Sequence, residues 1–175
     1  MGAVGGDLQT VSEAVRKTVR GRTEERLKNL LAERFHLVLR VDSKEQPVYF
    51  LLTVKSGPKL QAAKDPDGPA RGSSSMNNGI GHAVFTSADT AMLAEQLARR
   101  TGRLVIDKTG LKGTYDGTLD WTAEAGQPGA GTDPRADAVP TIFTAVQEQL
   151  GLKLESQKAP VNVFVLDHVE QPSEN

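Results

Sequence analysis

The feature that most constrains the fold is a unit that recurs three times along the chain: an amphipathic helix, a short stop and two strand-like segments. In the first copy, TEERLKNLLAERF places apolar side chains at helical spacing, at Leu27, Leu30, Leu31 and Phe35. The alternating run HLVLRV follows, then the polar break DSKEQP and the run VYFLLTV. We therefore expect one helix followed by two strands paired antiparallel.

The second copy begins near three residues that can cap a helix: Thr86, Ser87 and Asp89. The apolar stripe of its helix ADTAMLAEQLARR consists of Leu93, Ala94, Leu97 and Ala98. Gly102 is expected to end this helix, because a left-handed residue after the last turn carries no steric penalty without a Cβ. RLVID and TYDGTLDW then supply the strand pair.

The third copy starts at Pro140, a residue suited to the first helical turn, and runs to a stop at Gly151. Its apolar positions are Ile142, Val146 and Leu150. The strands expected after it are LKLES and VNVFVLDHV. Because both faces of VNVFVLDHV are apolar, we expect this strand to be central and covered on both sides.

The recurrence predicts an α+β fold of helix-strand-strand units, in which helices pack on one face of mixed or antiparallel sheets. Two stretches rich in Gly, Pro and polar residues, 61–82 and 123–138, offer little apolar surface and are predicted to be flexible loops. The remaining segments are an N-terminal helical extension, 1–22, and the three units 23–60, 83–122 and 139–175. We expect them to form one compact domain or two small lobes.

Composition excludes several classes of function. The chain has 175 residues, 38% of them hydrophobic and 25% charged, as in an ordinary globular protein. Its net charge of −1 provides no field to recruit nucleic acid, and the absence of cysteine excludes disulfides and thiolate chemistry. A basic segment from Arg16 to Lys28 lacks interleaved aromatic residues, so a solvated helix face is favoured over a nucleic-acid surface.

No apolar run is long enough to span a bilayer, so we expect no membrane insertion of this chain. The opening MGAVGGDLQT has neither the basic nor the apolar region of a signal peptide, and its glycines are also what a fusion junction would contain.

The segment LVIDKTGLKGTYDGTLDW, residues 104–121, begins with an apolar run that is followed by Asp107 and Lys108. These two residues start the sequence D-K-T-G, which surrounds the phosphoryl-accepting aspartate of ion-pumping ATPases. That chemistry requires a Mg²⁺ site built from further carboxylates. Leu111 stands where the pump motif has a second Thr, and no later Gly-Asp pair supplies the ligands. Asp and Gly are also what a turn requires, so Asp107 is interpreted as a turn residue.

Other residues with chemical potential give no convergent set. His36, His82 and His168 lack the spacing of a metal motif, so structural roles are favoured, and we predict neither a metal nor a cofactor. The serines of the loop 61–82 lack a nucleophile elbow. Tyr115 and Trp121 would share one face of a strand, where they serve as core if that face is covered or as a ligand platform if it is open.

The amino-acid sequences of three blocks resemble those of a known family. LLAERFHLVLRVDSKEQPVYFLLTVKSGPKL, LAEQLARRTGRLVIDKTGLKGTYDGTLDW and IFTAVQEQLGLKLESQKAPVNVFVLDHVEQPSEN are similar to the soil-associated family of uncharacterised bacterial proteins, a domain of unknown function. Members usually carry a signal peptide and a further segment before the first block, and some follow a membrane-embedded metallopeptidase. Neither feature is recognised in the sequence here, so we expect a trimmed or truncated form. The resemblance implies an extracytoplasmic setting and assigns no catalytic residues.

The order helix, strand, turn, strand is also loosely similar to the short N-terminal modules of secretins and TonB-dependent receptors, which bind protein partners in the periplasm. That similarity is one of pattern, and a fold by itself does not determine function.

Two functional hypotheses follow. The first is a non-catalytic extracytoplasmic module, possessing neither cofactor nor catalytic residues, that binds a protein, peptide or envelope component. Its expected partner surface includes Asp107, Lys108, Tyr115, Asp116 and Trp121. The alternative is a hydrolase acting on phosphoryl or envelope substrates through Asp107, Asp116 and a histidine. A pocket joining at least two of Asp107, Asp116, His82 and His168 would favour the enzyme.

Overall fold

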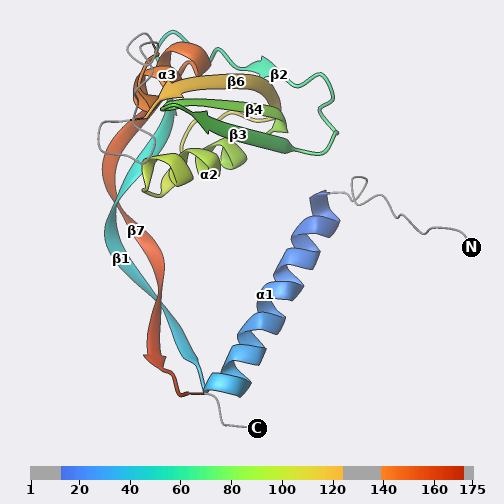
Figure 1. The fold of residues 1–175 in the computed structure, drawn as a ribbon, viewed down its shortest axis with the longest axis vertical. Coiled ribbons are helices and arrows are strands. Elements are labelled where there is room, and N and C mark those ends of the chain that lie inside the picture. The colour runs from blue at the N-terminus through green and yellow to red at the C-terminus, as the bar shows by residue number, and fades with distance from the viewer. Residues whose placement is uncertain (1–12, 124–138, 172–175) are drawn as a thin grey trace, which may run out of the picture. The chain divides into compact units, whose positions relative to one another are not determined.

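The computed structural model describes residues 13–123 and 139–171, except for the side chains of residues 13–20 and 24. Three helices are found there: α1 (Glu13–Phe35), α2 (Thr90–Thr101) and α3 (Ile142–Leu150) (Figure 1). The strands are β1 (Val38–Thr53), β2 (Gln61–Ala62), β3 (Arg71–Asn77), β4 (Ile80–Ala88), β5 (Val105–Asp107), β6 (Tyr115–Thr122) and β7 (Leu152–His168). One sheet is mixed and the other antiparallel, so the predicted α+β class is confirmed.

The chain divides into two compact units. Unit 1 comprises Met1–Gln46 and Ala159–Asn175, and unit 2 comprises Pro47–Lys158. The predicted helical extension is not separate from the first helix, because α1 runs without interruption from Glu13 to Phe35. The predicted loop 123–138 lies outside the described residues from residue 124 onward.

The predicted hairpins in the first and third copies are wrong. The polar break DSKEQP lies inside the continuous strand β1, and the corresponding residues of the third copy lie inside β7. The two strands are instead neighbours of each other in a sheet of order β5-β1-β7. Neither polar stretch contains a residue with positive φ, and without a turn-forming residue an extended chain continues through polar sequence.

The second predicted hairpin is also wrong, because its two strands belong to different sheets. β5 pairs parallel with β1, from Tyr49↔Val105 to Leu51↔Asp107. β6 pairs antiparallel with β4, in the register Ala83↔Leu119. Gly110 and Gly113, both with positive φ, lie between β5 and β6 and permit backbone conformations that other residues avoid.

The predicted flexible loop 61–82 contains most of a β-hairpin. β3 and β4 pair antiparallel and are joined by a two-residue turn at Asn78 and Gly79, whose φ values are 50° and 84°. Positive φ at both positions is typical of the type I′ turn that Asn-Gly favours. This dipeptide was therefore a hairpin signal in a stretch whose composition resembles that of a linker.

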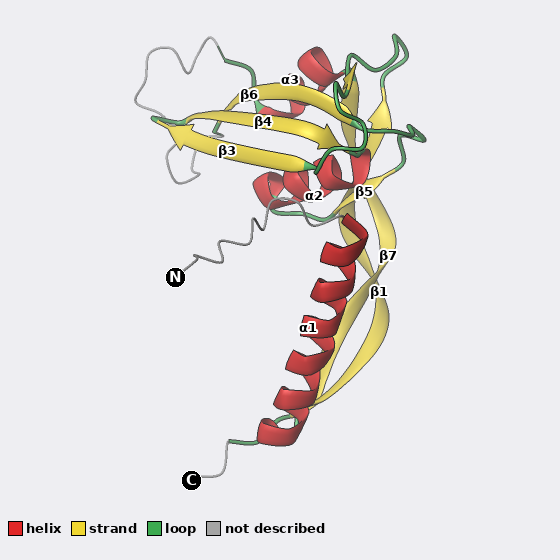
Figure 2. Cartoon of the chain, turned by 90° about the vertical axis from the view of Figure 1, so that its right-hand side faces the viewer, coloured by secondary structure: helices red, strands yellow, loops and turns green. Residues whose placement is uncertain are grey.

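Unit 2 has the main hydrophobic core. α2 packs on one face of the sheet β2-β6-β4-β3, and α3 lies beside β6 (Figure 2). The buried side chains from these elements include Phe85, Leu93, Leu97, Leu119, Trp121, Val146 and Leu150. Gly81 allows the ring of Trp121 to lie against the backbone of β4, because a Cβ there would be 2.1 Å from Trp121 Cε2.

Helix ends in unit 2 follow local sequence chemistry. The Asp89 side chain caps α2 by accepting a hydrogen bond from the Met92 backbone N–H at 2.7 Å, as one of the three predicted caps. Gly102 and Gly151 end α2 and α3 in the left-handed conformation, which confirms both predictions. α3 begins at Ile142, two residues after the predicted Pro140.

Two apolar features of unit 1 are exposed. On α1, Leu27 and Leu30 are each more than half exposed. On β7, Phe164 is 67% exposed and Leu166 is also exposed, so the prediction of a central strand covered on both sides is wrong. The reason is topological, since β7 is the edge strand of β5-β1-β7.

The contact between Gly81 and Trp121 generates a stability prediction. Gly81→Ala should lower the free energy of unfolding by about 1–3 kcal/mol, because the methyl group must displace a buried ring. Gly21→Ala is the matched control, since a Cβ at this position in α1 meets no atom within 4 Å and should stabilise the helix by up to about 1 kcal/mol. Urea unfolding followed by Trp121 fluorescence measures the effect in unit 2, and unfolding followed by far-UV circular dichroism also detects the change in α1. Equal stability of Gly81→Ala and the natural chain would contradict the packing described.

Candidate functional site

Asp107 ends β5 and is the acceptor of a local hydrogen-bond network. Its Oδ1 atom accepts hydrogen bonds from the backbone N–H of Thr109 at 2.9 Å and from Thr109 Oγ1 at 2.7 Å. Its Oδ2 atom accepts one from Thr90 Oγ1, at the start of α2, at 2.5 Å. A carboxylate bonded to the backbone two residues ahead is the turn geometry that the sequence predicts.

The same network keeps the Asp107 carboxylate ionised. Partial burial pushes its pKa upward, but the hydrogen bonds from Thr90 and Thr109 outweigh burial and lower the pKa below its ordinary value. The neighbouring Lys108 donates its backbone N–H to Leu51 O, and its Nζ lies 5.9 Å from the centre of the Phe50 ring. Because Asp107 accepts a hydrogen bond from Thr90, it connects the end of β5 to the start of α2.

Asp116 has a comparable structural role elsewhere in unit 2. Its two carboxylate oxygens accept hydrogen bonds from the backbone N–H groups of Lys64, at 3.0 Å, and Ser87, at 2.9 Å. These hydrogen bonds lower the pKa of Asp116, and the bond from Lys64 has the largest effect. Ser87 has a φ of 49° at the irregularity between Phe85 and Ala88 where β4 loses register with β6. Asp116 thus holds a strained part of β4 in place.

The two aromatic candidates of β6 belong to the core. Trp121 is 5% exposed, and the guanidinium of Arg100 lies 5.0 Å from the centre of its ring. Tyr115 is partly buried against the same core and donates its hydroxyl to Lys112 O at 3.0 Å. Leu119 is buried between them on the same face, so the core interpretation fits both rings better than an open platform.

The three histidines lie in two places. His36 and His168 both contact Glu170 in unit 1, at 3.0 and 2.8 Å, and the pKa of Glu170 is lowered chiefly by its hydrogen bond with His168. His82 in unit 2 pairs instead with Asp120, at 2.6 Å between Nδ1 and Oδ1. Within residues 13–123 and 139–171, no group of three or more His, Cys, Asp or Glu side chains has an arrangement that could hold a metal ion.

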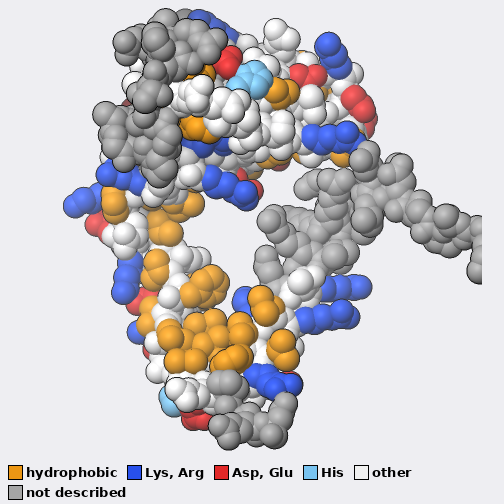
Figure 3. All heavy atoms as spheres, viewed as in Figure 1, with side chains coloured by type: hydrophobic (Ala, Val, Ile, Leu, Met, Phe, Trp, Pro, Cys, Tyr) orange, Lys and Arg blue, Asp and Glu red, His pale blue; other side chains and the backbone are white. Residues whose placement is uncertain are grey.

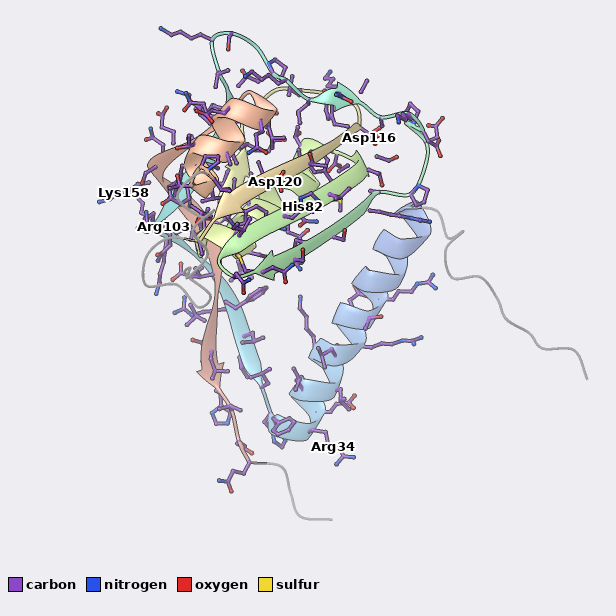
Figure 4. All side chains as sticks on the ribbon, turned by 45° about the horizontal axis from the view of Figure 1, so that its top comes forward. Arg34, His82, Arg103, Asp116, Asp120 and Lys158 are labelled. Atoms are coloured by element: carbon purple, nitrogen blue, oxygen red, sulfur yellow. The ribbon has the colours of Figure 1, made fainter. Side chains whose placement is uncertain are left out.

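The pair formed by His82 and Asp120 was not found from the sequence. The two residues are direct partners in the register of β4 and β6, and Figure 4 shows them on neighbouring strands. Gln149 of α3 fixes Asp120 from the other side, since its amide bonds both the N–H and the C=O of Asp120 at 2.9 and 2.8 Å. The alternation of polar and apolar residues in GHAVFT and GTLDWT could have placed His82 and Asp120 on the solvent faces of their strands. Only the pairing of β4 with β6 shows that the two residues lie opposite each other.

Ser75 lies opposite His82 in the β3–β4 register, so serine, histidine and aspartate occupy one row across three strands. The side chains of His82 and Asp120 are about half exposed, at 49% and 50%. In the described chain, Ser75 forms no hydrogen bond with His82, and the small cavity of unit 2 lies on the opposite, apolar face of the sheet. Within the described chain, this row therefore does not form the nucleophile-to-histidine hydrogen bond of a hydrolase triad.

The sequence-predicted residues are not brought together. Asp107 contacts the start of α2, Asp116 contacts Lys64 and Ser87, and His82 contacts Asp120. The cavity of unit 2 is lined by other residues, among them Ala83, Phe85, Met92, Leu97 and Leu119.

A different feature of the described surface is a set of exposed apolar side chains. Eight large hydrophobic side chains of unit 1 are exposed, and we call them the apolar surface of unit 1: Leu27, Leu30, Val38, Leu39, Val41, Phe164, Leu166 and Val169. Figure 3 shows hydrophobic side chains gathered over the ends of β1 and β7 in this unit and on α1. Exposed apolar side chains that gather in a patch larger than a few hundred Å² mark interaction surfaces.

Charged groups border this surface within unit 1. The Nζ of Lys28 lies 5.6 Å from the centre of the Phe164 ring, and Arg40 Nε donates to Asp167 Oδ1 at 3.0 Å. The backbone N–H of Glu170 donates to Phe35 O at 2.8 Å, which joins the end of α1 to the segment after β7. An apolar centre with a polar rim is the usual anatomy of a protein interface.

Comparison with known proteins identifies the family. Residues 7–169 match the model of a family described as a protein of unknown function, DUF3738, and the chain belongs to this family. Searches of curated proteins and of solved structures gave no significant match. Among the helices described, none combines the length and apolar character needed to cross a bilayer.

The Asp107 network predicts a pH dependence of stability. Because the folded pKa of Asp107 is depressed, its contribution is fully present above the unfolded pKa of about 4 and is lost as the pH falls through the folded value. Asp107→Asn should cost about 1 kcal/mol at pH 7 and should unfold with a weaker pH dependence below about pH 4. Urea titrations at a series of pH values measure both effects.

Asp67→Asn is the control for this titration, since Asp67 is exposed and accepts no hydrogen bond in the described chain. It should change the free energy of unfolding at pH 7 by less than about 0.5 kcal/mol. A natural chain and an Asp107→Asn variant with parallel pH profiles would show that the network does not stabilise the ionised carboxylate.

Proposed function

We propose that this chain is a non-catalytic, extracytoplasmic interaction module that binds a protein, a peptide or another component of the cell envelope. The observation that carries the proposal is the apolar surface of unit 1. Phe164 at 67% and Leu27 at 53% exposure lose the hydrophobic stabilisation that burial would give. Covering one such side chain in a complex contributes about 1.5–3 kcal/mol.

The geometry of the polar residues supports a binding role over catalysis. The carboxylates of Asp107 and Asp116 accept hydrogen bonds that hold the backbone of unit 2 together. The histidines of the described chain pair with Asp120 and Glu170, so neither Asp107 nor Asp116 is brought together with a histidine. The alternative function, a hydrolase using Asp107, Asp116 and a histidine, therefore has less support.

The extracytoplasmic location rests on the resemblance to the soil-associated family, whose members usually carry a signal peptide. The looser similarity to secretin and TonB-type modules adds no support, because it depended on helix-hairpin units that β1 and β7 replace with continuous strands. We therefore base the proposal on the exposed side chains of unit 1 and on the family resemblance.

The proposal predicts the effect of charge on the apolar surface. The purified chain should retain a discrete partner from native envelope extract, and Phe164→Lys should reduce recovery of that partner roughly 10- to 150-fold, as expected for 1.5–3 kcal/mol. Affinity capture with quantitative mass spectrometry measures the recovery.

Val84→Lys is the matched control, since Val84 is an exposed apolar residue on β4 in unit 2. It should retain the same partner at the same level as the natural chain. Equal recovery by Phe164→Lys and Val84→Lys would count against the apolar surface of unit 1 as the binding site. Circular dichroism checks that both variants keep their secondary structure.

A further inference from the structure

β3 in unit 2 has an unpaired edge. The sheet order is β2-β6-β4-β3, so β3 pairs with β4 on one side and with no strand of the described chain on the other. All seven residues of β3 are exposed. An edge of this length presents a row of backbone donors and acceptors that can accept another strand.

The turn at Asn78 and Gly79 fixes which backbone groups point outward. A two-residue hairpin closes on a hydrogen-bonded pair, here Asn77↔Ile80, and the pairs alternate from there along the ladder. The N–H and C=O groups of Gly72, Ser74 and Met76 therefore point away from β4. Gly79 O, next to the start of β4, accepts a hydrogen bond from the Ala123 N–H after β6, which agrees with odd-numbered backbone groups that face β6.

The edge lacks the features that usually prevent strand addition. β3 has the sequence RGSSSMN, in which Arg71 is the single charged residue and no proline occurs. Natural edge strands are commonly protected by lysine, proline, inward charges or a bulge. The register irregularity of this sheet lies in the pairing of β4 with β6, and β3 is in continuous register with β4 from Arg71 to Asn77.

The inner face of β3 lies beside both polar and apolar side chains of α2. A Cβ on Gly72 would meet the side chains of Gln96 and Met92 of α2, so this face of β3 lies over the helix. Met92 also lines the small apolar cavity of unit 2, about 20 Å³ in volume, together with Phe85 and Leu97. Met76, on the same face of β3, is 43% exposed. Methionine side chains adapt readily to the shape of an apolar partner.

We propose that the outer edge of β3 binds an extended peptide segment as an additional strand, with apolar side chains at every second position. The backbone groups of Gly72, Ser74 and Met76 would supply the hydrogen bonds, and the apolar side chains would lie beside Met76 and Met92. A second copy of β3 fits this edge less well, because its inner-face residues include Gly72 and Ser74, which bring little apolar surface. None of these residues belongs to the set that defines the apolar surface of unit 1.

Terminally blocked heptapeptides, equal in length to β3, test the proposal. A panel carries Val, Leu or Phe at alternate positions and Thr or Lys between them, and amide hydrogen exchange is read by NMR on the full chain. At least one peptide should slow exchange of the Ser74 and Met76 amides by about tenfold or more. The same peptide methylated at its alternate backbone nitrogens should give no protection, since it has no donors left to pair.

Variants of the chain provide the matched comparison. Ser74→Pro removes one outward N–H while leaving the β4-facing groups in place, and it should weaken peptide binding about tenfold or more. Ser74→Ala keeps the N–H and should bind within about twofold of the natural chain. Phe164→Lys should bind the peptides as tightly as the natural chain does. If this variant loses the partner from envelope extract but keeps peptide binding, the two sites act independently.

Three results would overturn the proposal. The first is that no panel peptide protects Ser74 and Met76 at millimolar concentration. The second is that N-methylated and unmethylated peptides protect equally, which would exclude backbone pairing. The third is protection that appears without peptide and increases with protein concentration, which would assign the edge to a second copy of the chain.

Discussion

The burial of apolar side chains is the constraint on which the structure depends, and it is divided unequally between the two units. Unit 2 buries Trp121, Leu119 and their neighbours between its antiparallel sheet and two helices. Unit 1 leaves large side chains such as Phe164 and Leu27 in solvent. Two-stranded ribbons and single helices are only marginally stable without a covering partner. Unit 1 thus has the larger share of exposed apolar side chains, and our proposal places the binding surface there.

The polar residues that attract attention in the sequence are needed for the scaffold of unit 2. Asp107 ties the end of β5 to α2, and Asp116 holds Ser87 at the irregular end of β4. Gln149 takes the place of a neighbouring strand for Asp120, because its amide pairs with both backbone groups of that residue. These interactions satisfy backbone groups that would otherwise be left unpaired at sheet edges. The edge of β3 has no such partner in the described chain.

Local chemistry could be predicted from the sequence, and long-range pairing could not. The cap at Asp89 and the helix stop at Gly102 depend on residues within one turn, and both are found as predicted. The pairing of β1 with β5 and β7 depends on residues far apart in the chain, so alternation suggested hairpins that do not form. The Asn-Gly turn of β3 and β4 was available in the sequence, but the surrounding composition of residues 61–82 favoured a linker. The exposure of Phe164 could not be predicted, because an apolar strand is equally consistent with a buried position and with a binding surface.

The most direct test of the central claim is site-specific photo-crosslinking in cells that produce the protein. Phe164→benzoylphenylalanine places a photoreactive group in the apolar surface of unit 1, and Val84→benzoylphenylalanine places the same group on the sheet of unit 2. Our account predicts a discrete covalent adduct with one envelope component from position 164, and none from position 84. An adduct only at position 84, or no adduct at position 164 in a correctly folded and localised protein, would contradict it.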